Sequence, residues 1–340
     1  TIDDPSEYFT TLLYTGNATD DRNLTNSANA GDFKPDLLWI KERSSTSAHQ
    51  LVDSTRGSSF ALMSDSTAVE DEDANRVQAF QTNGFQVGTA STVNQDTITN
   101  VAWQWKVNGG TTASNTDGSI TSTVQANTDA GFSIVSFTGT GATTTVGHGL
   151  GVTPKFFIIK SRSTGNWWTY TTVIDGSLDY LQLETTNAKA NSGLTAPTSS
   201  VFSVNSSVAP NTENIIAYCF TSIQGYSKIG KYIGNGSTDG TFVYTGFKPA
   251  WVMVKRTDSS QNWIMYDNKR NDDAPAGANV IDRLIYANAS DAEVDTGGAL
   301  MVDFLSNGFK MRGTHAASNG AGVHIYMAFA ESPFVSSEGM

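Results

Sequence analysis

The histidines, which could take part in acid-base or nucleophilic chemistry, are few and scattered in this sequence. The four histidines lack H-E-x-x-H spacing, and no G-x-S-x-G motif accompanies them. They are His49, His148, His315 and His324. Paired carboxylates are another route to hydrolysis, but no particular pair stands out. We therefore predict no catalytic residue and no enzymatic activity.

Metal binding is suggested by one acidic run, residues 70–73. An EF-hand counted from Asp71 needs glycine at its sixth position and a carboxylate at its twelfth. Those positions hold Arg76 and Thr82, so a solvated acidic loop is favoured, with a looser calcium site left open. The single cysteine, Cys219, excludes an intrachain disulfide and a cysteine-based zinc site. We predict no metal and no cofactor.

Two groups of aromatic residues are candidates for ligand binding: Trp168 with Tyr170, and Trp263 with Tyr266. Exposed rings of this kind can stack on the apolar faces of sugars. Alternate residues of a strand point to opposite faces, so at least one ring of each group is expected in the core. Packing is favoured over a sugar platform, and both interpretations stay open.

An Asp-x-x-Arg pattern occurs twice, as Asp53 with Arg56 and as Asp267 with Arg270. The pair is interpreted either as a charged binding pair on a loop or as a turn held by a charge-assisted hydrogen bond. The turn is favoured, because a feature present twice in one chain is more typical of architecture than of a unique site. The second copy of the repeat described below lacks the pair.

The elements that position these residues show an internal repeat. In residues 33–43, 152–162 and 247–257, a proline stands two residues before a four-residue apolar run that is followed by a lysine. Proline is tolerated where a strand begins. The apolar run is too continuous for a half-exposed strand, so both of its faces should be covered. Basic residues at its far end are expected to mark where the strand reaches solvent.

The repeat extends beyond these proline strands. Each copy opens with an aromatic strand and a glycine-rich turn, and each closes with a strand containing an alanine before an aromatic residue. Fourteen residues after the proline stands His49, Trp168 or Trp263. Short strands without helical periodicity predict an all-β protein of three tandem β-sandwich modules, jelly-roll or lectin-like.

The expected modules span residues 1–110, 131–224 and 225–340. Residues 111–130 are rich in Gly, Ser, Thr and Asn and are expected to form a linker or an extended arm.

Charge and hydropathy exclude two classes of partner. The net charge is −12 and no basic stripe is visible, which disfavours nucleic acid. The apolar runs have the length of strands and are far shorter than the roughly 20 residues that span a bilayer, so no membrane insertion is expected.

Several segments together resemble a family of virion proteins of tailed bacteriophages, common in marine phages, that carry repeated domains of unknown function. They are TIDDPSEYFTTLLYTGN, FKPDLLWIKERSSTSAHQLVDSTRG, NTDGSITSTVQANTDAGFSIVSFTGTG, GHGLGVTPKFFIIK and FVYTGFKPAWVMVKRTDSSQNWIMYDNKRN. The resemblance implies a tail-fibre, tail-associated or capsid-decorating protein located on the phage particle. It supplies no catalytic residue.

The expected partners are other virion proteins, further copies of this chain in a homo-oligomer, with a trimer favoured, and a host surface glycan or receptor. A carbohydrate-binding, lectin-like module array and a glycan depolymerase are the alternatives.

Overall fold

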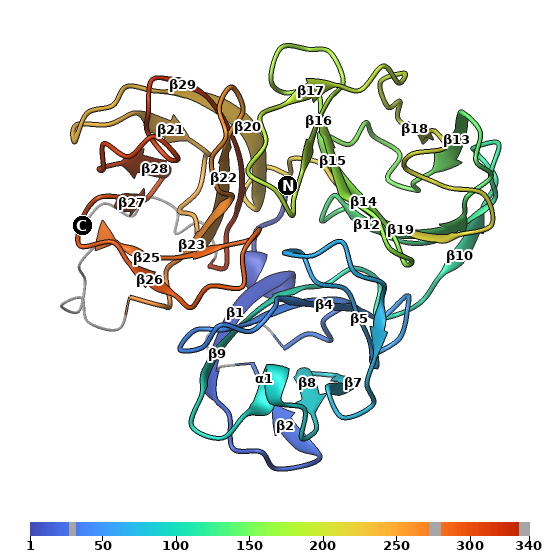
Figure 1. The fold of residues 1–340 in the computed structure, drawn as a ribbon, viewed down its shortest axis with the longest axis horizontal. Coiled ribbons are helices and arrows are strands. Elements are labelled where there is room, and N and C mark those ends of the chain that lie inside the picture. Colours follow the sequence, from blue (N-terminus) through green and yellow to red (C-terminus); the bar gives the residue numbers. More distant parts are fainter. Residues whose placement is uncertain (27–31, 272–279, 333–340) are drawn as a thin grey trace.

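The structure is a computed structural model that describes residues 1–26, 32–271 and 280–332. Nearly all elements in these residues are β-strands, which confirms the predicted all-β fold. Figure 1 shows three groups of strands around a common centre, and we call them the first (β1–β9), second (β10–β19) and third (β20–β29) modules. Within the predicted third module, residues 272–279 and 333–340 lie outside the described residues.

The first module contains a four-stranded antiparallel sheet in the order β1-β9-β3-β4. Two smaller sheets have the orders β2-β8-β7 and β5-β6. The bounds are η1 Pro5–Glu7, β1 Phe9–Thr15, β2 Arg22–Leu24, β3 Leu37–Glu42, β4 Gln50–Asp53, β5 Phe60–Ala61, β6 Asp71–Glu72, β7 Val77–Gln81, β8 Gly84–Val87, α1 Ser91–Asn94 and β9 Thr99–Trp105.

The second module contains an eight-stranded sheet in the order β10-β11-β12-β19-β14-β15-β16-β17 and a two-stranded sheet of β13 and β18. The bounds are β10 Ala113–Asn115, β11 Ser122–Asn127, β12 Phe132–Thr138, β13 Thr144–Gly147, β14 Phe156–Ser161, β15 Trp167–Thr171, β16 Asp179–Gln182, β17 Ala190–Asn191, β18 Val201–Val204 and β19 Asn214–Phe220.

The third module contains a six-stranded sheet in the order β20-β29-β22-β23-β25-β26 and a four-stranded sheet in the order β21-β28-β27-β24. The bounds are β20 Ser227–Gly234, β21 Phe242–Tyr244, β22 Trp251–Arg256, β23 Ile264–Asp267, β24 Val280–Ile281, β25 Arg283–Tyr286, β26 Val294–Asp295, β27 Val302–Leu305, β28 Gly308–Met311 and β29 Gly322–Phe329.

One strand order occurs three times. The order β1-β9-β3-β4 is repeated as β12-β19-β14-β15 and as β20-β29-β22-β23. In each copy the closing strand lies between the opening strand and the proline strand, and Pro35, Pro154 and Pro249 stand two residues before β3, β14 and β22. The repeat inferred from the sequence is therefore present in the topology, whereas the jelly-roll or lectin-like assignment of each module stays a prediction.

Residues 111–130 are not a free linker. They contain β10 and β11, which extend the sheet of the second module beyond β12. Ile120 and Val124 are buried in the core of that module. The composition pointed to a linker, but small β-branched residues also suit a pleated strand when a sheet edge is available.

Both faces of each proline strand are covered, as predicted from its continuous apolar run. In β3, Leu38 and Ile40 lie in the first module's own core, whereas Leu37 and Trp39 point into a core that all three modules share. The two-residue period of a strand produces this division. The strands β14 and β22 divide their side chains in the same way.

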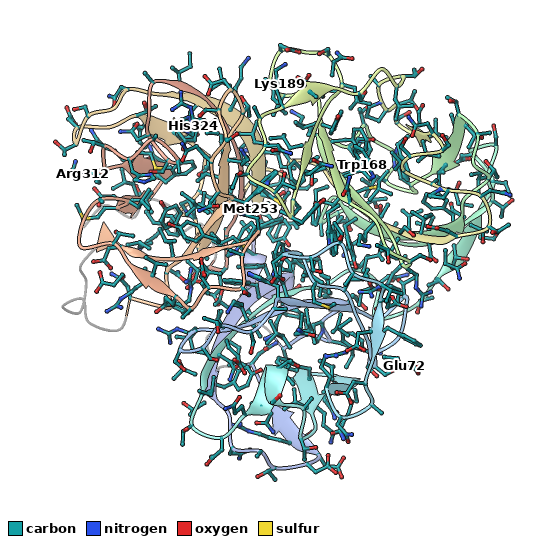
Figure 2. All side chains as sticks on the ribbon, in the orientation of Figure 1. Glu72, Trp168, Lys189, Met253, Arg312 and His324 are labelled. Carbon is teal, nitrogen blue, oxygen red and sulfur yellow. The ribbon has the colours of Figure 1, made fainter. Side chains whose placement is uncertain are left out.

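The shared core lies where the three modules meet and contains large aromatic side chains from each of them. The rings of Trp105 and Trp251 are 5.6 Å apart and nearly perpendicular, and the rings of Phe220 and Phe329 are 6.0 Å apart. Edge-to-face contacts of this kind are favourable for aromatic pairs. In Figure 2 side chains fill the centre, where Met253 is labelled.

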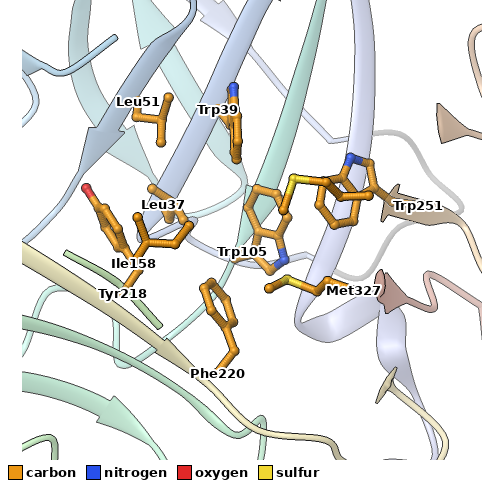
Figure 3. Close-up of a pocket in the computed structure, with 10 residues that line it drawn as sticks. Leu37, Trp39, Leu51, Trp105, Ile158, Tyr218, Phe220, Trp251 and Met327 are labelled. Carbon is orange, nitrogen blue, oxygen red and sulfur yellow. The ribbon is translucent and has the colours of Figure 1, made fainter. Parts of the chain in front are cut away.

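A small apolar cavity remains in this core, with a volume of about 20 Å³. Figure 3 shows that side chains of all three modules line it. The lining residues are Leu37, Trp39, Leu51, Trp105, Ile158, Tyr218, Phe220, Trp251, Met253 and Met327. A water molecule in such a space needs polar partners. The cavity is accordingly a packing defect of the shared core, too small for an organic ligand.

Candidate functional site

The aromatic residues proposed for ligand binding are mostly interior. Tyr170, Trp263 and Tyr266 are 2%, 1% and 0% exposed. Trp168 is partly exposed, and its ring packs edge-on against Tyr180 at 5.1 Å. The four rings therefore form no common surface on which a sugar could stack. Three of them serve packing, and a ligand-binding role of Trp168 stays a prediction.

Strand pairing shifts the second-copy equivalent of His49 and Trp263 by one residue from Trp168, the residue found by counting from the proline. Ile40 pairs with Gln50, Ile159 pairs with Trp168, and Val254 pairs with Ile264. The residues that precede these partners are His49, Trp167 and Trp263. Trp167, rather than Trp168, is thus the equivalent of His49 and Trp263, because the second copy is one residue shorter between its proline and β15.

Two of these equivalent side chains connect neighbouring modules through an indole N–H. Trp167 Nε1 donates to the carbonyl oxygens of Met63 at 2.8 Å and Ser66 at 3.1 Å, in the first module. Trp263 Nε1 donates to the carbonyl oxygen of Gln182 at 3.0 Å, in the second module. Both rings are buried, so each hydrogen bond satisfies polar groups that water cannot reach.

His49 makes the third connection and closes the ring of modules. Its Nε2 lies 3.0 Å from the carbonyl oxygen of Tyr286 and 3.2 Å from that of Ala289, both in the third module. The second module thus contacts the first, the first contacts the third, and the third contacts the second. We call these three contacts the 2–1, 1–3 and 3–2 junctions.

The lysine at the end of each apolar run is buried, so the prediction that the basic residues mark where the strand reaches solvent is wrong for the lysines, although Arg43 and Arg256 are partly exposed. Lys41, Lys160 and Lys255 are all fully buried. Each Nζ donates to the carbonyl oxygen of the next residue, at 2.6 to 2.7 Å. Lys160 also reaches Ala68 O in the first module at 3.2 Å, and Lys255 reaches Thr186 O in the second at 3.3 Å.

We expect the free energy of unfolding to rise between pH 8 and pH 10. Burial lowers the pKa of each of these lysines to about 8. In this window the folded chain has released protons that the unfolded chain still holds, so stability increases with pH, by about 1–2 kcal/mol per lysine. Below pH 8 the cost of burying the charge is fully present. Above pH 10, buried tyrosines with a raised pKa, such as Tyr218, act in the opposite direction.

Denaturant titrations of the wild type and of Lys160→Met at pH 7.5, 8.5 and 9.5 check this prediction. The variant lacks one of the three titrating groups, so its stability should rise less steeply with pH. Its stability at pH 7.5 also changes, because carbonyl groups lose their donor, and the slope is therefore the readout. Equal slopes in the two proteins would contradict the assignment.

The two Asp-x-x-Arg pairs form turns, each held by a buried ion pair. Asp53 Oδ1 accepts the backbone N–H of Arg56 at 2.9 Å, and Arg56 Nε donates to Asp53 Oδ2 at 2.5 Å. The corresponding distances for Asp267 and Arg270 are 3.1 and 2.5 Å. All four side chains are enclosed, which agrees with the architectural interpretation of the pairs.

The aspartate of each pair also accepts a hydrogen bond from a side chain of a neighbouring module. Tyr218 Oη, from the second module, donates to Asp53 Oδ2 at 2.7 Å. Trp103 Nε1, from the first module, donates to Asp267 Oδ2 at 2.9 Å. Strand pairing aligns Trp103 and Tyr218 with Met327 of the third module. A hydrogen-bond donor of this kind is therefore present at the 2–1 and 1–3 junctions and replaced by a thioether at the third.

The 3–2 junction is apolar where the other two are charged. Thr171 occupies the position of Asp53, since Phe156 pairs with Thr171 as Leu37 pairs with Asp53. Ile174, three residues later, lies in the shared core with Met327. The 3–2 junction therefore lacks the carboxylate, the guanidinium and the hydrogen-bond donor of the other two junctions. Because all three groups are absent together, no buried charge is left unpaired, and a buried ion pair can be replaced by apolar residues without loss of stability under this condition.

Outer ion pairs reinforce the two charged junctions. Glu70 binds Arg56 at 2.7 Å and Arg162 of the second module at 2.8 Å. Glu293 binds Arg270 at 3.1 Å and Arg43 of the first module at 3.0 Å. The solvated loop predicted for residues 70–73 is therefore wrong for Glu70, whose side chain is 8% exposed and binds two arginines.

A backbone hydrogen bond crosses each junction at the same place. The N–H groups of Glu70, Lys189 and Glu293 donate to the carbonyl oxygens of residues 162, 257 and 43, at 2.8, 2.8 and 2.7 Å. The 3–2 junction thus keeps this backbone hydrogen bond, but its donor residue is Lys189, whereas the donor residue of the other two junctions is a glutamate. The side chain of Lys189 instead binds Asp175 and Asp179 of its own module.

Neither a metal-binding cluster nor a membrane-spanning helix is present in the part of the chain that the structure describes. No group of three or more His, Cys, Asp or Glu side chains there could hold a metal ion. Nor is any described helix long and apolar enough to cross a membrane.

The described surface has one pair of exposed aromatic residues on a single strand. Phe242 and Tyr244 of β21 are 43% and 64% exposed and lie on the same side, because they are two residues apart. Their cross-strand partners are Lys310 and Gly308. The equivalent strand β13 of the second module pairs Val146 with Phe202, as β21 pairs Val243 with Phe309, and carries no aromatic residue.

Fold and junctions together define a single-chain ring of three related β modules around one aromatic core. Residues 4–333 match the family described as a domain of unknown function, DUF7483, and the chain belongs to this family. The match spans all three modules as one unit, in agreement with the shared core. No curated protein matches the chain.

Proposed function

We propose that this chain is a non-enzymatic structural protein of a bacteriophage virion: a tail-fibre, tail-associated or capsid-decorating component. The observation that carries the proposal is the closed ring, in which each module is hydrogen-bonded to both of its neighbours. A rigid body with a shared core suits a particle exposed to proteases and shear. The resemblance of the sequence to phage virion proteins supports the same role.

The charged residues that looked most like a binding or catalytic site have structural partners. Asp53, Arg56, Asp267 and Arg270 are enclosed at the 2–1 and 1–3 junctions. A catalytic group has to reach its substrate in a hydrogen-bonding pose. These four residues therefore support architecture rather than chemistry.

Mass spectrometry of purified particles tests the proposal on a phage whose genome encodes the chain. We expect its peptides at a fixed stoichiometry relative to the major capsid protein, and we expect labelling with antibody on intact particles. Absence from washed particles would overturn the virion assignment. Release of reducing ends from host polysaccharide by the purified chain would instead favour a glycan depolymerase.

Association with further copies of the chain is part of the proposal, with a homotrimer as the expected state. Within the described residues, β20 and β21 are the end strands of their sheets. Such edges offer backbone groups for pairing with another chain. Sedimentation equilibrium of the purified protein should give a multiple of the 36.3 kDa chain mass. A monomer at all concentrations would reject self-association.

Carbohydrate binding is the second candidate, and the exposed Phe242 and Tyr244 favour it. Ring faces open to solvent can stack on sugars, and we expect Phe242→Ala/Tyr244→Ala to abolish binding on a host-glycan array without a change in melting temperature. Trp168→Ala is the comparison, because that ring was the sequence-based candidate. Retained binding in the double variant would exclude β21, and loss only in Trp168→Ala would restore the original prediction.

A further inference from the structure

Both ring nitrogens of His49 form hydrogen bonds, and only one tautomer of the neutral ring can form all of them. Trp39 Nε1 donates to His49 Nδ1 at 2.8 Å, so Nδ1 carries a lone pair and no hydrogen. The hydrogen of the neutral ring is then on Nε2, which donates across the 1–3 junction to the carbonyl oxygens of Tyr286 and Ala289. This tautomer follows from the network, since the indole nitrogen of Trp39 can only donate.

We propose that His49 is an acid-sensitive latch that holds the first module to the third and releases it when the imidazole is protonated. A proton on Nδ1 would face the N–H of Trp39 at 2.8 Å, where two donors meet and no acceptor is present. The ring is fully buried, so solvent cannot reach it to accept the additional N–H. Protonation therefore requires the junction to separate.

The groups around His49 include charges of both signs. Lys41 of β3 is close enough to disfavour a second positive charge, whereas the carboxylate of Asp65 accepts the backbone N–H of His49 at 3.0 Å. Asp291 of the third module acts on Lys41. Burial is the largest effect and, with Lys41, lowers the pKa of His49 to about 3.

The sign of the linkage follows from this shift. An imidazole in the unfolded or opened state has its ordinary pKa of 6.5. Between pH 6.5 and pH 3 the opened state therefore binds a proton that the closed state does not. The closed junction loses stability as the pH falls through this window, and it is fully stable above pH 6.5.

The other two junctions carry tryptophan in place of histidine and do not titrate at this position. Trp167 and Trp263 are accompanied by Ile158 and Met253, at the place of Trp39. The first module thus has a tryptophan on β3 and a histidine beside β4, whereas the other two modules have an aliphatic or thioether side chain on the proline strand and a tryptophan at the position of His49. Trp39→Met/His49→Trp copies the third module's pair and approximately conserves the volume.

Hydrogen exchange at three matched amides tests the latch on the intact chain. The N–H groups of Glu293, Glu70 and Lys189 each cross one junction. Between pH 7 and pH 4.5, after correction for intrinsic exchange, we expect protection at Glu293 to fall at least tenfold more than at the other two amides. Trp39→Met/His49→Trp should abolish this difference. Equal loss at all three amides in the wild type would overturn the proposal, as would an unchanged difference in the double variant.

Two further variants keep the test decisive if the double variant does not fold. His49→Gln retains an N–H donor and cannot be protonated, so its 1–3 junction should be insensitive to acid. His148→Gln removes another buried histidine, inside the second module, and should leave the acid response of Glu293 as in the wild type. An acid response that follows His148 instead of His49 would refute the assignment.

Discussion

Arg56→Ile is expected to lower the free energy of unfolding by about 3–5 kcal/mol, because it leaves the carboxylate of Asp53 buried without its counter-ion. Arg56 also donates to the carbonyl oxygen of Leu51 at 2.8 Å and binds Glu70, so its removal strands several acceptors at once. A surface ion pair would contribute at most about 1 kcal/mol. The size of the loss thus distinguishes a junction from a solvated loop.

Most of this loss should return in Asp53→Thr/Arg56→Ile/Tyr218→Met. The triple variant installs at the 2–1 junction the residue types that the 3–2 junction has at Thr171, Ile174 and Met327. A threonine preserves the turn, since Thr171 Oγ1 accepts the N–H of Val173 at 3.2 Å. Removing Asp53, Arg56 and Tyr218 together leaves no unpaired charge in the turn, and Glu70 keeps Arg162 as its counter-ion.

Guanidinium denaturation of the wild type, the single variant and the triple variant measures both effects. Lys310→Met serves as the control, because that lysine is partly exposed and its partner Asp239 is exposed. Its loss is expected to stay near 1 kcal/mol or below. A triple variant less stable than Arg56→Ile would contradict the equivalence of the junctions.

Trp167→Ala is expected to cost about 3–5 kcal/mol, whereas Trp168→Ala should cost clearly less. The two tryptophans are adjacent in β15, but Trp167 is fully buried in the shared core and Trp168 is partly exposed. Truncating Trp167 also leaves the carbonyl groups of Met63 and Ser66 without its N–H. Its effect should therefore extend to the first module.

Thermal and denaturant unfolding of the two variants give the comparison directly. Trp263→Ala is the matched control at another junction, where the indole also bonds a neighbouring carbonyl, and it should resemble Trp167→Ala. If Trp168→Ala were the more damaging change, the one-residue shift derived from strand pairing would be wrong.

Local sequence pattern was sufficient to predict the three proline strands of this fold. The apolar runs after Pro35, Pro154 and Pro249 predicted strands covered on both faces, and each strand divides its side chains between two cores. Pattern was insufficient for residues 111–130, where Ser and Thr suit a linker and a strand equally. The neighbouring edge of β12 decides between them, and that edge is a tertiary feature.

The candidate site was predicted in part. The turns at Asp53 and Asp267 were foreseen as charge-assisted, but their partners Tyr218 and Trp103 lie 165 and 164 residues away. Periodicity describes neighbours within one element and carries no information on such contacts. For the same reason, the lysines after the proline strands looked like solvent-facing ends.

The sequence by itself determined an all-β chain written as three copies of one strand pattern, because apolar spacing and proline position act through the local backbone. Only the tertiary structure decided that the copies close into a ring, that three lysines and one histidine are buried in its junctions, and that tryptophans form a common core. Burial and hydrogen-bond partners depend on which surfaces meet, and in this chain those surfaces belong to different copies.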